Sequence, residues 1–337
     1  MSALSKQYSA PLLVNWSLSY ACNFNCEHCY SRLEKSDDLG TAEVLEAGRR
    51  LAAAGVLFAN FGGGEPMLRR DLLEVAGGLS GLGLSLSMNS NGWKIDAQAA
   101  AALKGAGFAS VGISLDSHRA EVHDAFRNRA GSWERATAAA RHLVAAGLRV
   151  TISTVVCRIN HRELVPLLEL ARGLGAVQDF LHNFKCSGKG MEHRFELDLE
   201  PLEWREFYRE ALELTRHEDL PEISFDDPIL ASLGARDAEH GIPGSTCGKL
   251  SLHLRPNGDI TPCGFIPHVL GNILRDDLGK IWRESQVLDA MRHKTAKGKC
   301  SSCGHYAACL GGCTARAFAV SGDFNAPDPH CWETPAE

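Results

Sequence analysis

The sequence predicts an α/β fold in which a partial (β/α)6 barrel is followed by a cysteine-rich C-terminal domain. From residue 12 to about 185, short β-rich runs alternate with Ala/Leu/Glu-rich helical segments, as in repeated βα units. Seven of the twelve cysteines then fall between residues 247 and 337, where metal ligation can replace an apolar core. We therefore expect a barrel over 1–200, a helical bridge over 201–246 and a cysteine-rich domain over 247–337.

Six runs have the composition of strands. They cover residues 12–20, 56–61, 84–89, 109–115, 148–156 and 177–184. One intervening helix is expected to stop at Gly55, and another to be capped by Ser132 and stopped at Gly147. Parallel strands joined by helical crossovers curl into a barrel whose sites collect at the carboxyl ends of the strands.

Composition excludes several classes of protein. The chain has 45% apolar and 23% charged residues, a formal net charge of -6 and no Lys/Arg run of five, which argues against a nucleic-acid surface. No apolar run is long enough to span a bilayer, and the first ten residues lack a secretory apolar region. We expect a cytoplasmic protein with no membrane or nucleic-acid partner.

Three cysteines stand close together in CNFNCEHCY, directly after the first strand. Cys22, Cys26 and Cys29 can hold three irons of a 4Fe-4S cluster and leave the fourth iron open to a ligand that is not protein. FGGGEP follows the second strand, so both loops open on the same face of the barrel. A zinc knuckle beside an unrelated glycine turn is the alternative.

At these motifs the chain resembles the radical S-adenosylmethionine (SAM) enzymes. The resemblance implies that SAM chelates the open iron and that reduction of the cluster releases a 5'-deoxyadenosyl radical. It also implies that Cys22, Cys26 and Cys29 hold the SAM-binding cluster. The implied SAM contacts are Gly62, Gly63, Gly64, Glu65, His28 along the adenine, Asn89, Asn91 and Ser114 at the ribose, and Arg127 on the carboxylate.

The C-terminal cysteines match the seven-cysteine SPASM pattern, which carries auxiliary 4Fe-4S clusters. The resemblance assigns Cys247, Cys263 and Cys313 to the first auxiliary cluster, and Cys300, Cys303, Cys309 and Cys331 to the second. CSSCGHYAAC alone would also suit zinc. Some SPASM proteins have an eighth cysteine where this chain has Gly241, so the fourth ligand of the first cluster stays open. His240, Cys186, an exogenous ligand or a substrate thiol could supply it.

The segments NFGGGEP, ISLDSHRAEVHDAFR, CSSCGHYAACLGGC and APDPHCW resemble the radical SAM/SPASM maturases of ribosomally synthesised peptides, especially the mycofactocin type. Related maturases make crosslinks or thioether bonds, decarboxylate oxidatively or excise backbone. GGCTARAFAVSGD also resembles enzymes that act on tetrapyrrole propionates, which is a second hypothesis. A noncatalytic Fe-S or zinc scaffold is the third.

Partners and one further cysteine complete the expectations. Only eleven residues precede the first strand, too few for a peptide-recognition domain, so we expect a separate small recognition protein to present the precursor peptide. The family also implies an electron donor of the flavodoxin or ferredoxin type. Cys186 in NFKCSGKG follows the sixth strand, and we expect this thiol to act catalytically near the substrate.

Overall fold

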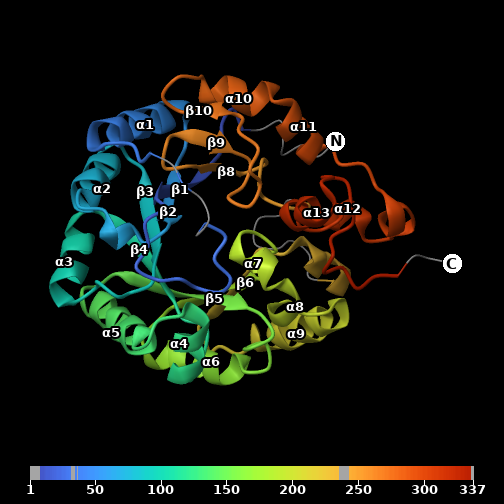
Figure 1. The fold of residues 1–337 in the computed structure, drawn as a ribbon, viewed down its shortest axis with the longest axis horizontal. Helices are drawn as coiled ribbons and strands as arrows, with labels where there is room; N and C mark the ends of the chain where they lie inside the picture. Colours follow the sequence, from blue (N-terminus) through green and yellow to red (C-terminus); the bar gives the residue numbers. More distant parts are fainter. Residues whose placement is uncertain (1–7, 32–34, 36, 235–242, 335–337) are drawn as a thin grey trace.

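The ten strands of the described chain form one sheet in the order β10-β9-β8-β1-β2-β3-β4-β5-β6-β7. The structure is a computed structural model, and it describes residues 8–31, 35, 37–234 and 243–334. Strands β1 to β7 pair in parallel, each with the next along the chain. In Figure 1 helices α1 to α6 follow an arc round the outside of this sheet, while α12 and α13 lie on the opposite side. This arrangement is the predicted partial barrel.

The six predicted strands are present, and each end lies within two residues of its expected position. They are β1 Leu13–Ser19, β2 Phe58–Gly63, β3 Ser85–Ser90, β4 Phe108–Ser114, β5 Arg149–Val156 and β6 Gln178–Asn183. The helices between and after them are α1 Thr41–Ala54, α2 Leu72–Gly81, α3 Ala97–Gly105, α4 Ala120–Arg127, α5 Ser132–Ala145 and α6 Leu164–Gly173. A short 3-10 turn, Pro66–Leu68, follows β2.

The helix ends follow the sequence signals with one exception. Gly55 caps α1 in the left-handed conformation at φ 93°, as expected of a C-terminal glycine. Helix α5 begins at Ser132, but its N-cap is Gly131. The capping role predicted for Ser132 is therefore wrong, because its hydroxyl instead donates a 2.8 Å hydrogen bond to Asp124 at the preceding turn.

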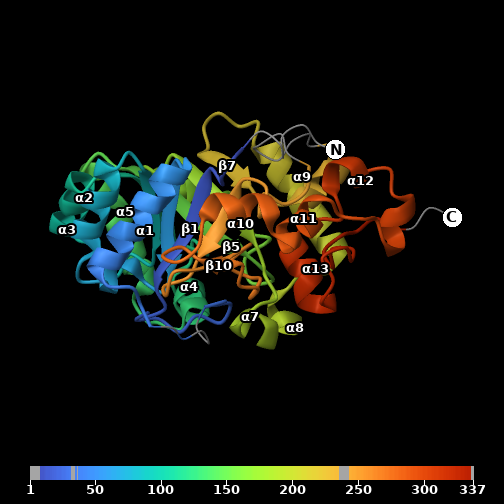
Figure 2. The ribbon, with the colours of Figure 1, turned by 90° about the horizontal axis from the view of Figure 1, so that it is seen from above.

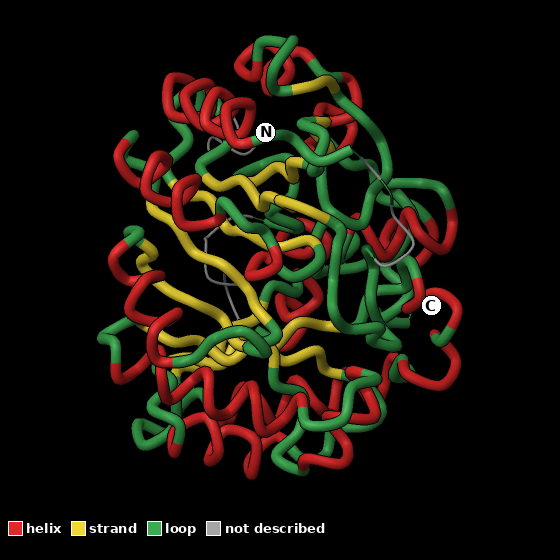
Figure 3. Tube along the Cα trace, turned by 60° about the vertical axis from the view of Figure 1, so that its left-hand side comes forward, coloured by secondary structure: helices red, strands yellow, loops and turns green. Residues whose placement is uncertain are grey.

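The two faces of the sheet differ in chemistry. Val14, Ala59 and Leu86 belong to the apolar core that the outer helices cover. The next residue of each strand is polar: Asn60 donates to Asn15 Oδ1 at 3.2 Å, and Ser87 Oγ donates to Asn60 Oδ1 at 2.9 Å. A parallel sheet that helices cover on both sides has apolar residues on both faces, so a polar face indicates that helices do not pack against it. The polar inner face, inside the ring of helices in Figure 3, therefore suits a ligand cavity.

Four short strands escaped prediction from the sequence. Strand β7 Glu222–Phe225 pairs with β6, β8 Ser251–Leu254 pairs in parallel with β1, and β9 Asp259–Thr261 and β10 Gly271–Asn272 complete an antiparallel edge. Strands of two to four residues are too short to show a period. The sheet thus continues across residue 247, which falls between β7 and β8.

The rest of the chain adds short helices. These are α7 Lys189–Glu192, α8 Arg194–Leu197, α9 Pro201–Leu214, α10 Leu278–Glu284, α11 Gln286–Arg292, α12 Tyr306–Cys309 and α13 Thr314–Ser321, with 3-10 turns at Pro228–Leu233 and Gly298–Ser302. Leu278 and Trp282 of α10 join the barrel core. Figure 2 shows α12 and α13 at the end of the molecule away from α2 and α3. Within the described residues, no helix is long and apolar enough to cross a membrane.

Candidate functional site

The loop after β1 brings the first three cysteines together. Cys26 is buried, whereas Cys22 and Cys29 are partly exposed. The pKa of the Cys26 thiol is raised to about 11, chiefly by burial and in smaller part by the neighbouring Cys29 and Cys22, while the Arg127 charge opposes the shift. Cys26 therefore lies close enough to the other two cysteines to interact with both.

The glycines after β2 hold the cysteine loop in place. A Cβ atom on Gly64 would lie 2.1 Å from the carbonyl oxygen of Ala21, and Gly63 has a φ of 98°. The amides of Gly64 and Glu65 donate to the carbonyls of Ser19 and Ala21, at 2.7 and 2.9 Å. Gly63 and Gly64 thus dock one loop on the other. Gly62 differs, because a Cβ there would meet nothing within 4 Å.

Glu65 joins the ends of β2 and β3. Its buried carboxylate accepts hydrogen bonds from Ser90 Oγ at 2.8 Å, from the Asn91 amide at 2.8 Å and from the Met67 amide at 3.0 Å. Burial raises its pKa, although these three donors oppose the shift. A carboxylate has about four acceptor positions, so one remains for the ammonium group of a ligand.

Three predicted polar residues lie at the ends of β3 and β4. Asn89 lies over Gly112, where a Cβ atom would be 2.1 Å from its Oδ1. Asn91 Nδ2 donates to Asn23 Oδ1 at 2.9 Å and so reaches the cysteine loop. Ser114 ends β4 and lies beside Ser153 of β5. All three lie at or just beyond the carboxyl ends of these strands.

His28 contacts the helix that carries Arg127. Its ring stacks on Phe126 with centroids 4.3 Å apart. Burial and the Arg127 charge lower the pKa of His28 to about 3, so the imidazole is neutral. Its Nδ1 atom and Asn23 Nδ2 are buried without a hydrogen-bond partner. Buried polar atoms are normally satisfied, so these two fit a site completed by a polar ligand such as SAM.

Arg127 is paired with an aspartate that the sequence did not single out. Its Nε and Nη2 donate to the two oxygens of Asp116 at 2.6 and 3.0 Å. Asp116 is fully buried; burial favours its neutral form, but Arg127, His123 and His28 together outweigh burial and hold its pKa well below the usual range. Arg127 also interacts with Cys26. A charged residue directly after a buried strand was the signal for Asp116.

The cysteines of the C-terminal part fall into two groups. Cys247 interacts directly with Cys263 and electrostatically with Cys313. The second group is linked by thiol–thiol interactions of Cys300 with Cys331 and Cys303, and of Cys309 with Cys331. Asp226, another residue that sequence reasoning missed, acts on both Cys247 and Cys263. No group in the described residues is arranged to hold a single metal ion.

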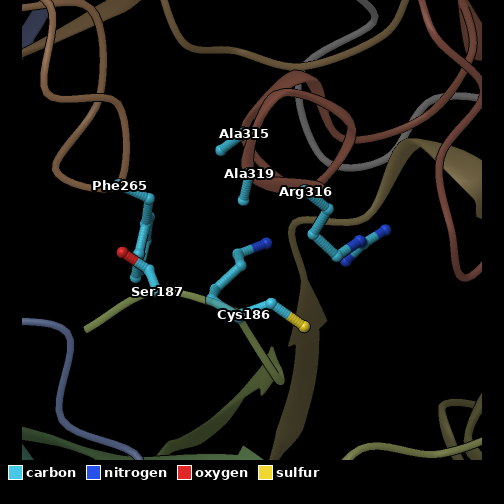
Figure 4. Close-up of a pocket in the computed structure, with 7 residues that line it drawn as sticks. Cys186, Ser187, Phe265, Ala315, Arg316 and Ala319 are labelled. Atoms are coloured by element: carbon cyan, nitrogen blue, oxygen red, sulfur yellow. The ribbon is translucent and has the colours of Figure 1, made fainter. Parts of the chain in front are cut away.

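Cys186 lies outside these groups. Its buried thiol donates to Asp198 Oδ2 at 3.5 Å, and burial raises its pKa to about 12. Figure 4 shows Cys186 beside a small pocket with Phe265, Ala315 and Arg316, its sulfur directed away from Phe265. His240, the other residue of the chain considered as a fourth ligand, lies outside the described residues, as does Gly241, where some SPASM proteins have a cysteine.

A buried ionic network ties the second cysteine group to the barrel. Arg316 donates to Asp227 Oδ1 at 2.7 Å and to both oxygens of Asp328, at 2.9 Å from Nε and 2.5 Å from Nη2. Asp328 accepts from the amides of Cys313 and His330, at 2.6 and 3.0 Å. The network therefore positions backbone that carries cysteines of both groups.

Comparison with known proteins agrees with this geometry. The radical SAM superfamily matches residues 16–171, and the iron-sulfur cluster-binding SPASM domain matches residues 246–304. A solved structure of SuiB from Streptococcus suis, bound to S-adenosylmethionine, superposes with a TM-score of 0.79 at 17% identity, over 96% of this chain and 78% of that one. The barrel and the cysteine-rich part therefore share the fold of a SAM-binding protein.

Two curated relatives align over nearly the whole chain. The AdoMet-dependent heme synthase of Methanosarcina barkeri is 28% identical, over 98% of both chains. The mycofactocin maturase MftC of Mycolicibacterium smegmatis is 34% identical, over 97% of this chain and 85% of that protein. The chain belongs to the radical SAM/SPASM peptide maturases, in the family of the mycofactocin maturases.

Proposed function

We propose that this enzyme reductively cleaves SAM and uses the resulting radical to modify a ribosomally synthesised peptide. The observation that carries the proposal is the opening of the cysteine loop and the FGGGEP loop onto one polar sheet face, in a chain 34% identical to a mycofactocin maturase. The modification of the peptide is a crosslink, an oxidative decarboxylation, a thioether bond or an excision of backbone.

The proposed SAM site uses the residues at the carboxyl ends of β1 to β4. Cys22, Cys26 and Cys29 would hold the cluster, and the free acceptor position of Glu65 would take the SAM ammonium. The open face at Gly62 allows close approach, and neutral His28 would lie along the adenine. When bound, the cluster and SAM supply a 5'-deoxyadenosyl radical.

The remaining contacts complete the proposed site. Asn89, Asn91 and Ser114 would hold the ribose, since their amide and hydroxyl groups lie at the ends of β3 and β4. Arg127 would use the donors that Asp116 leaves free to bind the SAM carboxylate. Asp116 supports this role by fixing the guanidinium in one orientation.

We further propose three 4Fe-4S clusters. The two groups of C-terminal cysteines support two auxiliary clusters, one on Cys247, Cys263 and Cys313, the other on Cys300, Cys303, Cys309 and Cys331. The division at residues 200 and 246 is part of the same proposal. Cys186 stays a proposed catalytic residue, although its hydrogen bond to Asp198 gives the thiol a structural role as well.

Two partners belong to the proposal. All ten strands within the described chain belong to the barrel sheet, so none of them forms a separate small sheet that could take up a leader peptide as an added strand. A separate small recognition protein would supply that edge. A flavodoxin- or ferredoxin-type protein would donate electrons to the cluster.

A tetrapyrrole substrate is the second candidate, favoured by the 28% identity to the heme synthase. The deciding experiment incubates anaerobically reconstituted, reduced enzyme with SAM, with or without the precursor peptide and the recognition protein. We expect 5'-deoxyadenosine in all cases and a peptide of changed mass only when both additions are present. Conversion of a tetrapyrrole alone would contradict the peptide assignment, and no 5'-deoxyadenosine at all would contradict radical chemistry.

A Cys26→Ala variant is the control. It should lose SAM cleavage while the auxiliary clusters remain, because Cys26 lies in the first cysteine loop. Iron analysis on the same samples tests the cluster count: three clusters correspond to about twelve irons per chain. One or two tightly held zinc ions would support the scaffold alternative instead.

A further inference from the structure

Lys185 lies where the barrel meets the cysteine-rich part. It follows β6, and its Nζ atom is 3.5 Å from the sulfur of Cys313. The same ammonium group donates to Asn183 Oδ1 and lies 5.9 Å from the centroid of the Phe265 ring. Asn183 is itself fixed, since its Nδ2 donates to Asp227 at 2.6 Å. The ammonium group is thus held against one cysteine sulfur from several sides.

The segment that carries Lys185 also contacts the first cysteine loop. The Lys189 amide donates to the Cys29 carbonyl at 3.0 Å, and a Cβ atom on Gly188 would lie 2.4 Å from the Tyr30 carbonyl. Tyr30 in turn packs on Phe265, with ring centroids 4.8 Å apart. Backbone contacts therefore tie the segment that carries Lys185 to the first cysteine loop.

The ammonium group is charged in this setting. Lysine carries its proton at neutral pH, and the charges that act on Lys185 include those of the carboxylates Asp226 and Asp227. Lys185 also acts electrostatically on Cys263, a second member of the same cysteine group. The charge of Lys185 therefore acts on two of the three cysteines of this group, Cys263 and Cys313.

We propose that Lys185 donates a charged hydrogen bond to the Cys313 sulfur of the first auxiliary cluster and thereby raises the reduction potential of that cluster. The proposal rests on the cluster assignment proposed above. Hydrogen bonds to the sulfurs and nearby charge are among the factors that set the potential of an iron-sulfur cluster. Reduction adds negative charge, which a cation beside the sulfur stabilises. Lys185 is a positioning residue here, because it acts through the cluster and touches no substrate.

The test measures potentials by EPR-monitored redox titration of reconstituted protein. Lys185→Met removes both the charge and the donor at similar length. We expect it to shift the one-electron equilibrium of one cluster about tenfold towards the oxidised form, a decrease of 59 mV. The other two clusters should keep their potentials. The affected signal should be the one that Cys263→Ala removes.

Two further variants separate charge from packing. Lys185→Arg keeps a charged donor and should restore most of the potential. Lys189→Met is the matched control: this lysine lies in the same segment but pairs with Glu27, so its loss should leave the first auxiliary cluster unchanged. Equal potentials in wild type and Lys185→Met would overturn the proposal, as would an equal shift in the Lys189 variant.

Iron content separates this inference from the assignment on which it rests. Wild-type protein with about twelve irons and an unshifted Lys185→Met variant would refute the role of Lys185 alone. Wild-type protein that lacks a signal dependent on Cys263 would refute the cluster assignment and this inference together. If the Lys185→Met variant assembles its clusters poorly, the Lys185→Gln variant takes its place. Glutamine keeps a neutral donor, so we expect the potential to fall by only part of the decrease expected for Lys185→Met.

Discussion

Arg127 in the barrel and Arg316 in the cysteine-rich part are both buried, and each lies near a cysteine, but their partners differ. Arg127 faces a single carboxylate, Asp116, which takes two of its five N–H donors. Arg316 faces two carboxylates, Asp227 and Asp328, with three hydrogen bonds. Both arginines keep donors that these carboxylates do not use, including the buried Nη1 of Arg316, so the contrast lies in their carboxylate partners.

The partners of each aspartate extend the contrast. Asp116 also accepts a hydrogen bond from the backbone amide of Val155 on the neighbouring strand β5, so the Asp116–Arg127 pair lies within the barrel. Asp227 accepts from Tyr208 of α9, and Asp328 accepts from the amide of Cys313, so the Arg316 network joins the barrel, α9 and the C-terminal segment. We infer that Arg127 belongs to a binding site and that Arg316 holds the two parts of the molecule together.

The largest expected effect breaks the second arrangement. Arg316→Met leaves two buried carboxylates without their arginine, and removing one partner of a buried ion pair typically destabilises a protein by about 3 to 5 kcal/mol. We expect a loss of that size in urea unfolding of the reconstituted protein, together with lower iron content, because Asp328 no longer fixes the Cys313 amide.

Arg216→Met is the control for this change. Arg216 pairs with Glu213 on the surface of α9, with both side chains largely exposed, so its loss should leave the unfolding midpoint unchanged. Similar midpoints for the Arg316 and Arg216 variants would show that the buried network does not hold the two parts together.

A smaller change sharpens the comparison. Arg127→Lys keeps the charge but loses the planar fork that binds two carboxylates at once. We expect the affinity for SAM to fall at least tenfold, or about 1.4 kcal/mol, measured by calorimetry on reconstituted protein. Arg316→Lys should leave SAM affinity unchanged while lowering stability. If both variants weaken SAM binding equally, the two arginines do not differ in the way that their partners suggest.

The sequence predicted the barrel well because its strands are six to eight residues long and alternate between apolar and polar residues. Gly55 and Gly147, both with positive φ, marked where helices stop. Strands β7 to β10 were missed because each is too short for a period and depends on pairing with distant strands, as β8 does with β1. The prediction that Ser132 caps its helix was wrong because the Ser132 hydroxyl donates its hydrogen bond to Asp124 instead.

The candidate site was predictable only where residues form a motif. Cysteine spacing and FGGGEP were readable along the chain, and cysteines of each predicted group interact with one another in the structure. Asp227 and Lys185 carry no local signal, and Asp116 has only its position directly after a buried strand, since the importance of all three comes from contacts 89, 128 and 11 residues away in the chain. Long-range charge pairing depends on the folded arrangement and has no pattern in the sequence.

Asp179 on β6 is a further buried carboxylate, and it completes the comparison because no arginine pairs with it. Its Oδ1 accepts from Thr154 at 3.1 Å, and its Oδ2 is buried without a partner. Burial raises its pKa from 3.8 to about 7. The folded protein therefore binds the proton of the Asp179 carboxyl group more tightly than the unfolded chain does. As a result, the free energy of unfolding falls as the pH rises from about 4 to about 7.

Asp179→Asn should remove this pH dependence. Between pH 5 and pH 8 we expect wild-type protein to lose roughly 2 kcal/mol of stability relative to the variant, from two pH units at 1.36 kcal/mol per unit, discounted for relaxation of the site. Urea unfolding at both pH values measures the difference. Asp323→Asn is the control, since this exposed aspartate pairs with Lys297 at the surface and should alter the profile little. A stability difference between wild type and Asp179→Asn that stays constant from pH 5 to pH 8 would mean that Asp179 is already ionised in the folded protein at pH 5.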